Sequence, residues 1–225
     1  MNMGYKEDFI DFMVRSGVLT FGDFVTKSGR KTPYFVNTGN YQNSEQIAQL
    51  GKYYASCIKE NFGDTTFLYG PAYKGIPLVI TASVALYNDH NIVVPYAFNR
   101  KEAKDHGEGG SIVGYKPKDG DVAMIIEDVI TAGSSVKESV PLLKAQADVN
   151  IKSLIISVDR MEKGSDDKTA IQEISELFGI TTYAIVNIRE IIAHLHNRDI
   201  DGKVYIDDNM KEMIENHLKQ HGVAE

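Results

Sequence analysis

The sequence predicts an α/β protein in which a central parallel sheet is flanked by helices on both sides. Five apolar runs rich in β-forming residues alternate, for the most part, with segments whose apolar residues recur at the period of a helix. The apolar runs are nearly continuous, which is typical of strands that are covered on both faces. Strands that alternate with helices in this way join into a parallel sheet.

The predicted elements follow one another from about residue 44 to residue 186. Strands are expected at 65–69, 92–98, 122–126, 153–158 and 180–186, and helices at 44–61, 76–88, 135–147 and 168–178. The apolar run at 75–87 is too short to span a bilayer and contains Thr81 and Ser83, so it is interpreted as a buried helix. Cys57 lies with Tyr54 on the apolar face of the helix at 44–61 and is expected in the core.

Two segments interrupt this alternation. The first is the N-terminal region up to about residue 41, where a short helix at 5–16 precedes a glycine-bearing stretch. The second is the polar segment 99–118, NRKEAKDHGEGGSIVGYKPK, which stands where a short connection would be normal. Long loops in compact domains are usually active-site lids or disordered linkers. A lid is favoured here because the charges are mixed rather than repetitive and alternate with Gly107, Gly109 and Gly110.

Composition narrows the class of protein. A chain of 225 residues suits one domain over 1–225, and its net charge of −7 argues against nucleic-acid binding, which draws on a basic surface. A small anionic ligand stays possible because a local cationic cluster can override the global charge. Cys57 is the only cysteine, so no internal disulfide can form and a reducing cytoplasm is expected. The acidic N-terminus is unlike a signal peptide, and no membrane segment is predicted.

The stretch MIIEDVITAGSS, residues 124–135, places two acids and a loop of small residues after a predicted strand. Ligands of open parallel sheets bind beyond the carboxyl ends of the strands. The small residues offer unobstructed backbone N–H groups and three hydroxyls near a helix start, which suits a phosphate monoester. Glu127 and Asp128 would repel a phosphate in the same place, so they are expected to accept hydrogen bonds from a sugar diol. A phosphate and a diol at this separation describe ribose 5-phosphate.

A simpler interpretation is available for the same stretch. Glu127 and Asp128 could merely end a strand while Ser134 and Ser135 cap a helix, and this is the commoner outcome for an arbitrary sequence of this kind. Nucleotide-binding loops with the patterns G-x-x-x-x-G-K-[ST] or G-x-G-x-x-G after a strand are absent from the sequence.

EDVITAGSS resembles the phosphoribosyl-diphosphate (PRPP) binding motif of type I phosphoribosyltransferases. Together with FGDFVTKSGRKTPYFVNTG, GPAYKGIPL, FNRKEAKDHGEGG and VDRMEKG, it closely resembles the orotate phosphoribosyltransferases, in order from about residue 9 to residue 189. The resemblance implies the type I phosphoribosyltransferase fold, with a small hood subdomain to which 1–41 contribute and a flexible catalytic loop at 99–118. It also implies transfer of the phosphoribosyl group from PRPP to orotate, giving orotidine 5′-monophosphate and diphosphate in pyrimidine biosynthesis.

The same resemblance implies which residues bind PRPP. They are Lys27, Tyr73, Lys74, Arg100, Lys101, Lys104, His106, Glu127, Asp128, Val129, Ile130, Thr131, Ala132, Gly133, Ser134 and Ser135. The catalytic residues among them are Arg100, Lys104, His106 and Asp128. Lys104 and His106 are expected to reach the site of a neighbouring subunit in a homodimer. Mg²⁺ is expected to be held mainly through PRPP, with no direct protein ligand.

Orotate carries a carboxylate, and the resemblance assigns Lys27, Phe35, Val36, Thr131 and Arg160 to its binding. A guanidinium can hold a carboxylate through two parallel hydrogen bonds, which is the role expected of Arg160. Without the family match, a pairing of Arg160 with Asp159 or Glu162 would be about as plausible. The sequence departs from the family pattern at Val36, where a second aromatic is common, and at Glu127, where Asp is common.

Other assignments stay open at this stage. The family could act on a purine or on uracil, although Arg160 would then lack a carboxylate to bind. A PRPP-sensing regulator would not need the segment 99–118, and a PRPP synthase-like diphosphokinase would need an ATP site that the sequence does not resemble. Arg30 and Lys31 are interpreted as solvated charges. The remaining histidines show no ligand spacing and are expected at the surface: His90, His194, His196, His217 and His221. His194 and His196 are two residues apart, so on a helix they would point away from each other.

Overall fold

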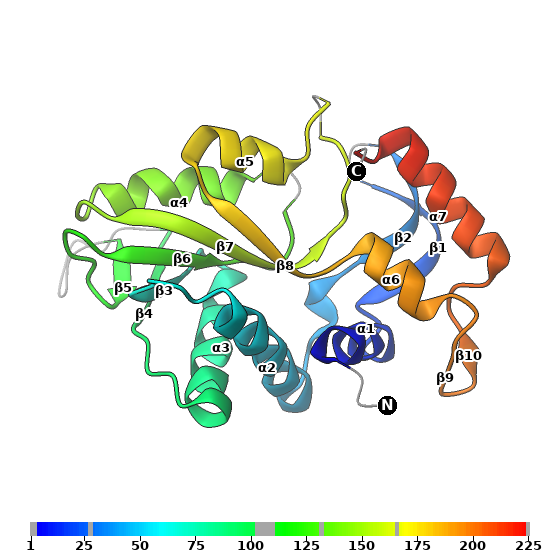
Figure 1. The fold of residues 1–225 in the computed structure, drawn as a ribbon, viewed down its shortest axis with the longest axis horizontal. Coiled ribbons are helices and arrows are strands. Elements are labelled where there is room, and N and C mark those ends of the chain that lie inside the picture. Colours follow the sequence, from blue (N-terminus) through cyan, green and yellow to red (C-terminus); the bar gives the residue numbers. More distant parts are fainter. Residues whose placement is uncertain (1–3, 27–28, 102–110, 131–132, 165–166, 224–225) are drawn as a thin grey trace. The chain divides into compact units, whose positions relative to one another are not determined.

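The structure is a computed structural model that describes residues 4–26, 29–101, 111–130, 133–164 and 167–223. The chain divides into two compact units, and Figure 1 shows the elements of both. The sheet unit consists of Ile47–Ser157 and Ala170–Ile185. The terminal unit consists of Met1–Gln46, Val158–Thr169 and Val186–Glu225.

A six-stranded sheet with the order β5-β4-β3-β6-β7-β8 forms the centre of the sheet unit. The strands are β3 (Phe67–Gly70), β4 (Tyr96–Asn99), β5 (Ile112–Gly114), β6 (Val122–Ile126), β7 (Asn150–Asp159) and β8 (Thr181–Asn187). Strand β3 pairs in parallel with β4 and with β6, and β6 pairs in parallel with β7. The predicted parallel sheet is therefore confirmed, with one addition: β5 pairs antiparallel to β4 at the edge.

Helices cover both faces of this sheet, as Figure 1 shows, with α2 and α3 on one face and α4 and α5 on the other. Their bounds are α2 (Ser44–Glu60), α3 (Gly75–His90), α4 (Ser134–Lys144) and α5 (Ala170–Phe178). Fully buried Phe67, Tyr69 and Ile125 from the sheet share one apolar cluster with Val136 of α4 and Ile174 of α5. Burial on both faces explains why the strand sequences are continuously apolar.

The terminal unit combines the two ends of the chain with the internal segment Val158–Thr169. It contains α1 (Tyr5–Arg15), β1 (Leu19–Val25), β2 (Lys31–Val36), the short 3-10 helix η1 (Thr38–Asn40), α6 (Ile188–Leu195), β9 (Asp199–Ile200), β10 (Lys203–Val204) and α7 (Asp208–His221). Strands β1 and β2 form an antiparallel hairpin with an irregular register between Phe21 and Phe24. The helix α7 packs against β2, and α1 packs against α6.

Part of the polar segment 99–118, which the sequence predicts to be a loop, forms a strand. Ile112–Gly114 forms the edge strand β5, and Ile112 is buried. Tyr115 packs on Phe67 with ring centroids 5.4 Å apart. These apolar side chains give the last part of the segment a place in the core, so the expectation of a structureless loop up to residue 118 is wrong. Residues 102–110 of the predicted lid lie outside the described part of the chain.

Two further expectations need correction. The strand expected at 92–98 begins only at Tyr96, because Asn91 ends α3 in a left-handed conformation and Val93 is exposed. The expected surface position of His194 is also wrong. Its side chain is 8 % exposed and lies 2.8 Å from a carboxylate oxygen of buried Asp11, because a charged partner in the interior makes burial of the imidazole favourable.

The remaining predicted helices and strands are present within a few residues of their expected bounds. In the part of the chain that the structure describes, no helix combines the length and apolar character needed to cross a bilayer. The expectation of a single domain over 1–225 stays a prediction.

Candidate active site

The sheet unit has a topological switch point between β3 and β6. The chain leaves β3 to form β4 on one side and later returns to form β6 on the other side of β3. In open α/β sheets the ligand crevice lies beyond the carboxyl ends of the strands at such a point. The segments that follow β3 and β6, residues 71–74 and 127–133, therefore define the candidate site.

The segment after β3, Pro71-Ala72-Tyr73-Lys74, is a tight connection between a strand and a helix. Its Ala72–Tyr73 peptide bond is cis. A Cβ atom placed on Gly70 would lie 2.2 Å from the carbonyl oxygen of Gly75, so only glycine fits where the chain folds back on itself. The amide N–H of Ala72 donates to Oδ1 of Asn99, at 2.7 Å. Asn99, at the end of β4, therefore holds the shape of this connection.

Lys74 reaches from this connection to the end of β6. Its Nζ donates to Oδ2 of Asp128 at 2.6 Å, while 63 % of the lysine side chain is exposed. Lys101 lies at the same end of the sheet, with its Nζ 5.1 Å from the ring centroid of Tyr73. Arg100 donates its backbone N–H to the carbonyl of Ser111, which closes the base of the predicted lid. Three predicted cationic residues, Lys74, Arg100 and Lys101, thus belong to one end of the sheet.

Glu127 and Asp128 are both buried, with 6 % exposure each. Their backbone carbonyls are held from two sides: the hydroxyl of Tyr54 donates to Glu127 at 2.7 Å, and that of Ser157 donates to Asp128 at 2.6 Å. The Oε2 atom of Glu127 accepts the amide N–H of Asp128 at 3.0 Å. The acid pair is therefore fixed in place by α2 and β7 rather than lying loose at a strand end.

Burial is the main reason why the pKa of Glu127 is raised to about 7. Hydrogen bonding to Ser135 opposes this shift, whereas the charge of Asp128 adds to it. Glu127 can therefore exist in both protonation states near neutral pH, next to an aspartate that is ion-paired with Lys74.

The loop after β6 ends in a helix start that is shaped for an anion. Gly133 has a φ of 65°, and Ser134 and Ser135 form the first residues of α4. The first amide N–H groups of a helix have no partner within it and point toward a ligand at its N-terminus. A Cβ atom on Gly133 would approach Cδ1 of Ile174 to 3.0 Å, so glycine is favoured here on two grounds. Val129 and Ile130 connect the acid pair to this helix start, whereas Thr131 and Ala132 lie outside the described residues.

In the terminal unit, Arg160 directly follows β7. Its Nε and Nη2 atoms donate to Oε1 of Glu162 at 3.2 and 2.8 Å, and Nη2 also lies 3.4 Å from Oγ1 of Thr32. The guanidinium lies over the ring of Tyr34, 4.9 Å from its centroid. The pairing of Arg160 with Glu162, considered from the sequence as an alternative, is therefore present in the structure.

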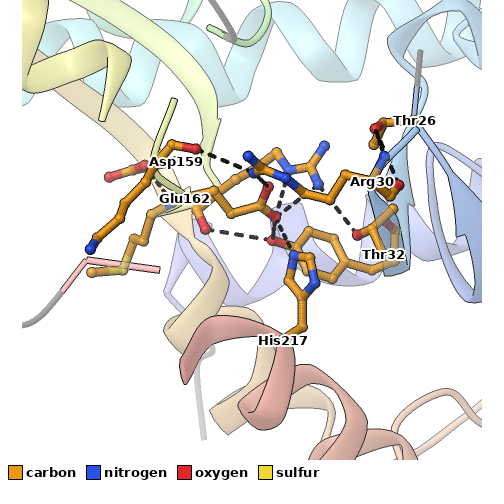
Figure 2. A network of polar contacts seen from close by, with 10 residues as sticks. Thr26, Arg30, Thr32, Asp159, Glu162 and His217 are labelled. Carbon is orange, nitrogen blue, oxygen red and sulfur yellow. Dashed lines mark hydrogen bonds and ion pairs between the residues drawn. The ribbon is translucent and has the colours of Figure 1, made fainter. Parts of the chain in front are cut away.

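Glu162 also accepts hydrogen bonds from Tyr34 and His217, at 2.5 and 3.1 Å. Figure 2 shows Glu162 among these partners, with His217 reaching it from α7. Burial by itself would raise the pKa of Glu162, but the hydrogen bonds and the Arg160 charge outweigh it and lower the pKa to about 2. Arg30 lies 3.5 Å from Oε2 and donates to the carbonyl of Lys163, so its interpretation as a solvated charge is wrong.

The structure divides the predicted site residues between the two units. Glu127, Asp128 and the start of α4 share the sheet unit with Tyr73, Lys74, Arg100 and Lys101, whereas Phe35, Val36 and Arg160 belong to the terminal unit. Phe35 is 39 % exposed, and its ring lies 5.8 Å from that of Phe24. Lys27, Lys104, His106, Thr131 and Ala132 lie outside the described residues.

Sequence reasoning missed the residues that hold the site in shape. Tyr54, Asn99 and Ser157 were not predicted as site residues, because each acts on a residue distant in sequence. The expected surface position of His217 is wrong: it is 7 % exposed, because its imidazole pairs with the carboxylate of Glu162. Asn99 carried a weak signal, since it ends a predicted strand just before the charged segment. Tyr54 was predicted only as part of a buried helix face.

Comparison with known proteins identifies the family to which the chain belongs. A model described as the phosphoribosyl transferase domain matches residues 37–201. The fold and the site therefore define a phosphoribosyltransferase. Curated orotate phosphoribosyltransferases of Clostridium beijerinckii and Clostridium acetobutylicum are 57 % and 53 % identical to the chain, over 97 % of its length and 98 % of theirs. The chain belongs to the orotate phosphoribosyltransferase family.

A solved structure agrees with this relationship. The crystal structure of orotate phosphoribosyltransferase from Francisella tularensis superposes with a TM-score of 0.84 at 36 % sequence identity. The match covers 96 % of this chain and 100 % of the other. The type I phosphoribosyltransferase fold expected from the sequence is thereby confirmed.

Proposed function

We propose that this protein transfers the 5-phosphoribosyl group from PRPP to orotate, releasing diphosphate and forming orotidine 5′-monophosphate, a step of pyrimidine biosynthesis. One observation carries the proposal: at the switch point of the sheet, a buried acid pair precedes the start of α4, whose first N–H groups suit an anion. The names of the relatives support orotate as the acceptor.

The end of β6 suits the ribose 5-phosphate part of PRPP. The N–H groups and hydroxyls at the start of α4 would bind the monophosphate. The carboxylates of Glu127 and Asp128 would accept hydrogen bonds from the ribose hydroxyls. Tyr54 and Ser157 hold the backbone carbonyls of these two residues, which fixes the direction of their side chains. Asp128 would also favour the positive charge that develops on the sugar when diphosphate leaves.

The cationic residues suit the leaving diphosphate. The Lys74–Asp128 ion pair offers a lysine that can exchange its carboxylate for a phosphate oxygen without travelling far. Arg100, Lys101, Lys104 and His106 of the predicted lid would stabilise the negative charge that grows on the leaving group. Orotate would then add through a ring nitrogen from the opposite face, and holding base and sugar in line lowers the entropic barrier.

Mg²⁺ is the expected cofactor, and the described residues fit an ion that arrives with PRPP. Among them, no three His, Cys, Asp or Glu side chains gather into a cage for a metal ion. Mg²⁺ prefers substrate phosphates and water to an all-protein cage. When bound, it would neutralise charge on the diphosphate and make it a better leaving group.

Arg160 is the proposed receptor for the carboxylate of orotate, with Phe35 and Val36 next to the pyrimidine and Lys27 and Thr131 completing the set. A guanidinium that is fixed by several contacts recognises a planar carboxylate well. Purines and uracil lack this carboxylate, so the same residue would discriminate against them.

A homodimer in which the lid of one subunit acts in the site of the other also belongs to the proposal. Exposed apolar side chains support a subunit contact: Val84 and Tyr87, one turn apart on α3, are 56 % and 62 % exposed. The cytoplasmic location predicted from the single cysteine stays a prediction.

One assay tests the proposed reaction. Orotate absorbance should fall when PRPP and Mg²⁺ are added to the protein, and orotidine 5′-monophosphate should form in equal amount. Uracil and hypoxanthine serve as acceptor controls and should not be consumed at a comparable rate. Turnover of either control base in place of orotate would assign another phosphoribosyltransferase, and PRPP binding without turnover of any base would indicate a regulator.

A further inference from the structure

Glu162 lies at the centre of a partly buried polar network that the proposed reaction does not by itself require. Its Oε1 atom accepts from the Tyr34 hydroxyl, from His217 and from two nitrogens of Arg160. Its Oε2 atom lies 3.5 Å from Nη1 of Arg30. Figure 2 shows that the network joins separate segments of the chain. Thr32, which lies near Arg160, belongs to the hairpin, His217 belongs to α7, and Glu162 belongs to the turn after β7.

The turn between Arg160 and Glu162 has a strained backbone. Met161, between Arg160 and Glu162, has a φ of 54°, a conformation that is uncommon for a bulky residue and costs free energy. Two hydrogen bonds hold it there: its N–H donates to Asp159 at 2.8 Å, and its carbonyl accepts from the N–H of Val223 at 3.0 Å. The strained turn allows two side chains only two positions apart to meet at 2.8 Å.

The geometry leaves one side of the guanidinium of Arg160 for a ligand. Glu162 occupies the Nε–Nη2 edge, and the ring of Tyr34 lies against the face. The guanidinium hydrogen bonds to Glu162 and Thr32 run from Nε and Nη2, so they occupy the edge opposite Nη1. A group that is bound on one edge and one face keeps a constant direction for its remaining N–H donors.

The charges of the network also favour an additional anion. Arg30 and Arg160 bring two permanent positive charges to the single carboxylate of Glu162. Asp159, the other acid drawn in Figure 2, accepts a hydrogen bond from the backbone of Met161. A partly buried site with an excess guanidinium is stabilised when a ligand supplies the missing negative charge.

We propose that Glu162 is a positioning residue for acceptor recognition: it holds Arg160 by one edge, with help from Tyr34 and His217, so that the other edge faces the carboxylate of the base. This inference rests on the proposed function, because it takes Arg160 as the receptor for orotate. The test also distinguishes the opposite relation, in which Glu162 competes with the substrate carboxylate for Arg160. The two relations predict opposite changes in affinity for orotate.

Glu162→Gln separates them, because it keeps the size of the side chain and removes its charge. If Glu162 positions Arg160, the KM for orotate should rise by about tenfold or more, which corresponds to a loss of about 1.4 kcal/mol. The KM for PRPP should stay within about twofold of the original value, since a local change at Arg160 leaves the sheet unit alone. The preference for orotate over uracil, measured as the ratio of their kcat/KM values, should fall. An unchanged or lower KM for orotate would overturn the proposal.

Two further variants distinguish an effect on orotate binding from a folding defect. Glu215→Gln removes an exposed carboxylate from α7, where it pairs with Lys211 at 3.8 Å, and should leave every kinetic constant unchanged. Tyr34→Phe removes only the hydroxyl that donates to Glu162 and should raise the KM for orotate by about threefold. If Glu162→Gln fails to fold in a thermal melt, Tyr34→Phe decides: an unchanged KM for orotate then rejects the proposal.

The wild-type protein distinguishes this inference from the proposed function. If the wild type converts orotate and both Glu162→Gln and Tyr34→Phe keep its kinetic constants, only the role of Glu162 is rejected and the proposed function stands. No conversion of orotate by the wild type would reject the proposed function and the inference together.

Discussion

At the scale of single residues, the site depends on charges that are buried together with their partners. Glu127 is buried and the side chain of Glu162 is 11 % exposed, yet their pKa values move in opposite directions, to about 7 and about 2. The difference arises because Glu162 accepts hydrogen bonds from Arg160, Tyr34 and His217, whereas Glu127 lies beside another acid. Burial beside another acid therefore makes Glu127 a candidate proton acceptor near neutral pH, whereas its hydrogen-bond donors and the Arg160 charge keep Glu162 negatively charged in spite of burial.

The raised pKa of Glu127 predicts a pH-dependent stability. An ordinary glutamate in the unfolded chain has a pKa of 4.5, so between about 4.5 and 7 the folded state holds a proton that the unfolded state has lost. The stabilisation is complete below pH 4.5 and is lost as the pH rises through 7. Glu127→Gln avoids this loss, and at pH 8 it should be more stable than the wild type by on the order of 3 kcal/mol.

Thermal melts from pH 4 to pH 8 check this expectation. The difference in melting temperature between Glu127→Gln and the wild type should be near zero at pH 4 and grow toward pH 8. Glu138→Gln, which changes an exposed carboxylate of α4, is the matched control and should show no such trend. A constant difference across the pH range would contradict the proposed burial of an ionised Glu127.

At the scale of secondary-structure elements, the start of α4 is the feature on which phosphate binding depends. Gly133→Ala should raise the KM for PRPP by about tenfold, because Ala disfavours the left-handed φ of 65° and its methyl group would crowd Ile174. Destabilisation of about 1 kcal/mol should accompany this change. Steady-state kinetics with PRPP as the varied substrate, together with a thermal melt, measure both effects.

Gly120→Ala is the control for backbone strain. Gly120 has a φ of 86°, and a methyl group there would meet no atom within 4 Å. It should therefore lose a similar amount of stability while the KM for PRPP stays unchanged. Equal effects of the two substitutions on that KM would mean that the helix start of α4 does not contact the phosphate.

At the scale of the whole molecule, the proposed exchange of lids between subunits is open to a direct test. Lys104→Ala should lower turnover by roughly two to four orders of magnitude if the lid stabilises the leaving diphosphate. Asp128→Asn should impair the other part of the site, the acid pair that contacts the ribose. Mixed dimers of the two variants should then recover part of the activity, because one of their two sites combines an intact lid with an intact acid pair.

Activity of the mixture is compared with that of each variant alone after the subunits have been allowed to exchange. No recovery, with exchange verified by a tag on one variant, would indicate that each site is complete within one chain. Near-normal turnover of Lys104→Ala by itself would remove the lid lysine from the mechanism.

The amino-acid sequence by itself determined the α/β class, the parallel strands, the helices between them and the acid pair before a small-residue loop. These features are local, because apolar periodicity and turn residues act over a few positions along the chain. The C-terminal helices and the strand β5 escaped prediction. Their apolar positions become interpretable only once β2 and β4 are present as packing partners.

Only the tertiary structure decided how the functional side chains are held. Tyr54 and Ser157 fix the acid pair, and His217 reaches Glu162 from 55 positions away along the chain. Arg30 and His194, which look like ordinary surface residues in the sequence, are paired with acids in the structure. Such pairings form because burial makes an unpartnered charge costly, and burial is a property of the folded chain rather than of any short stretch of it.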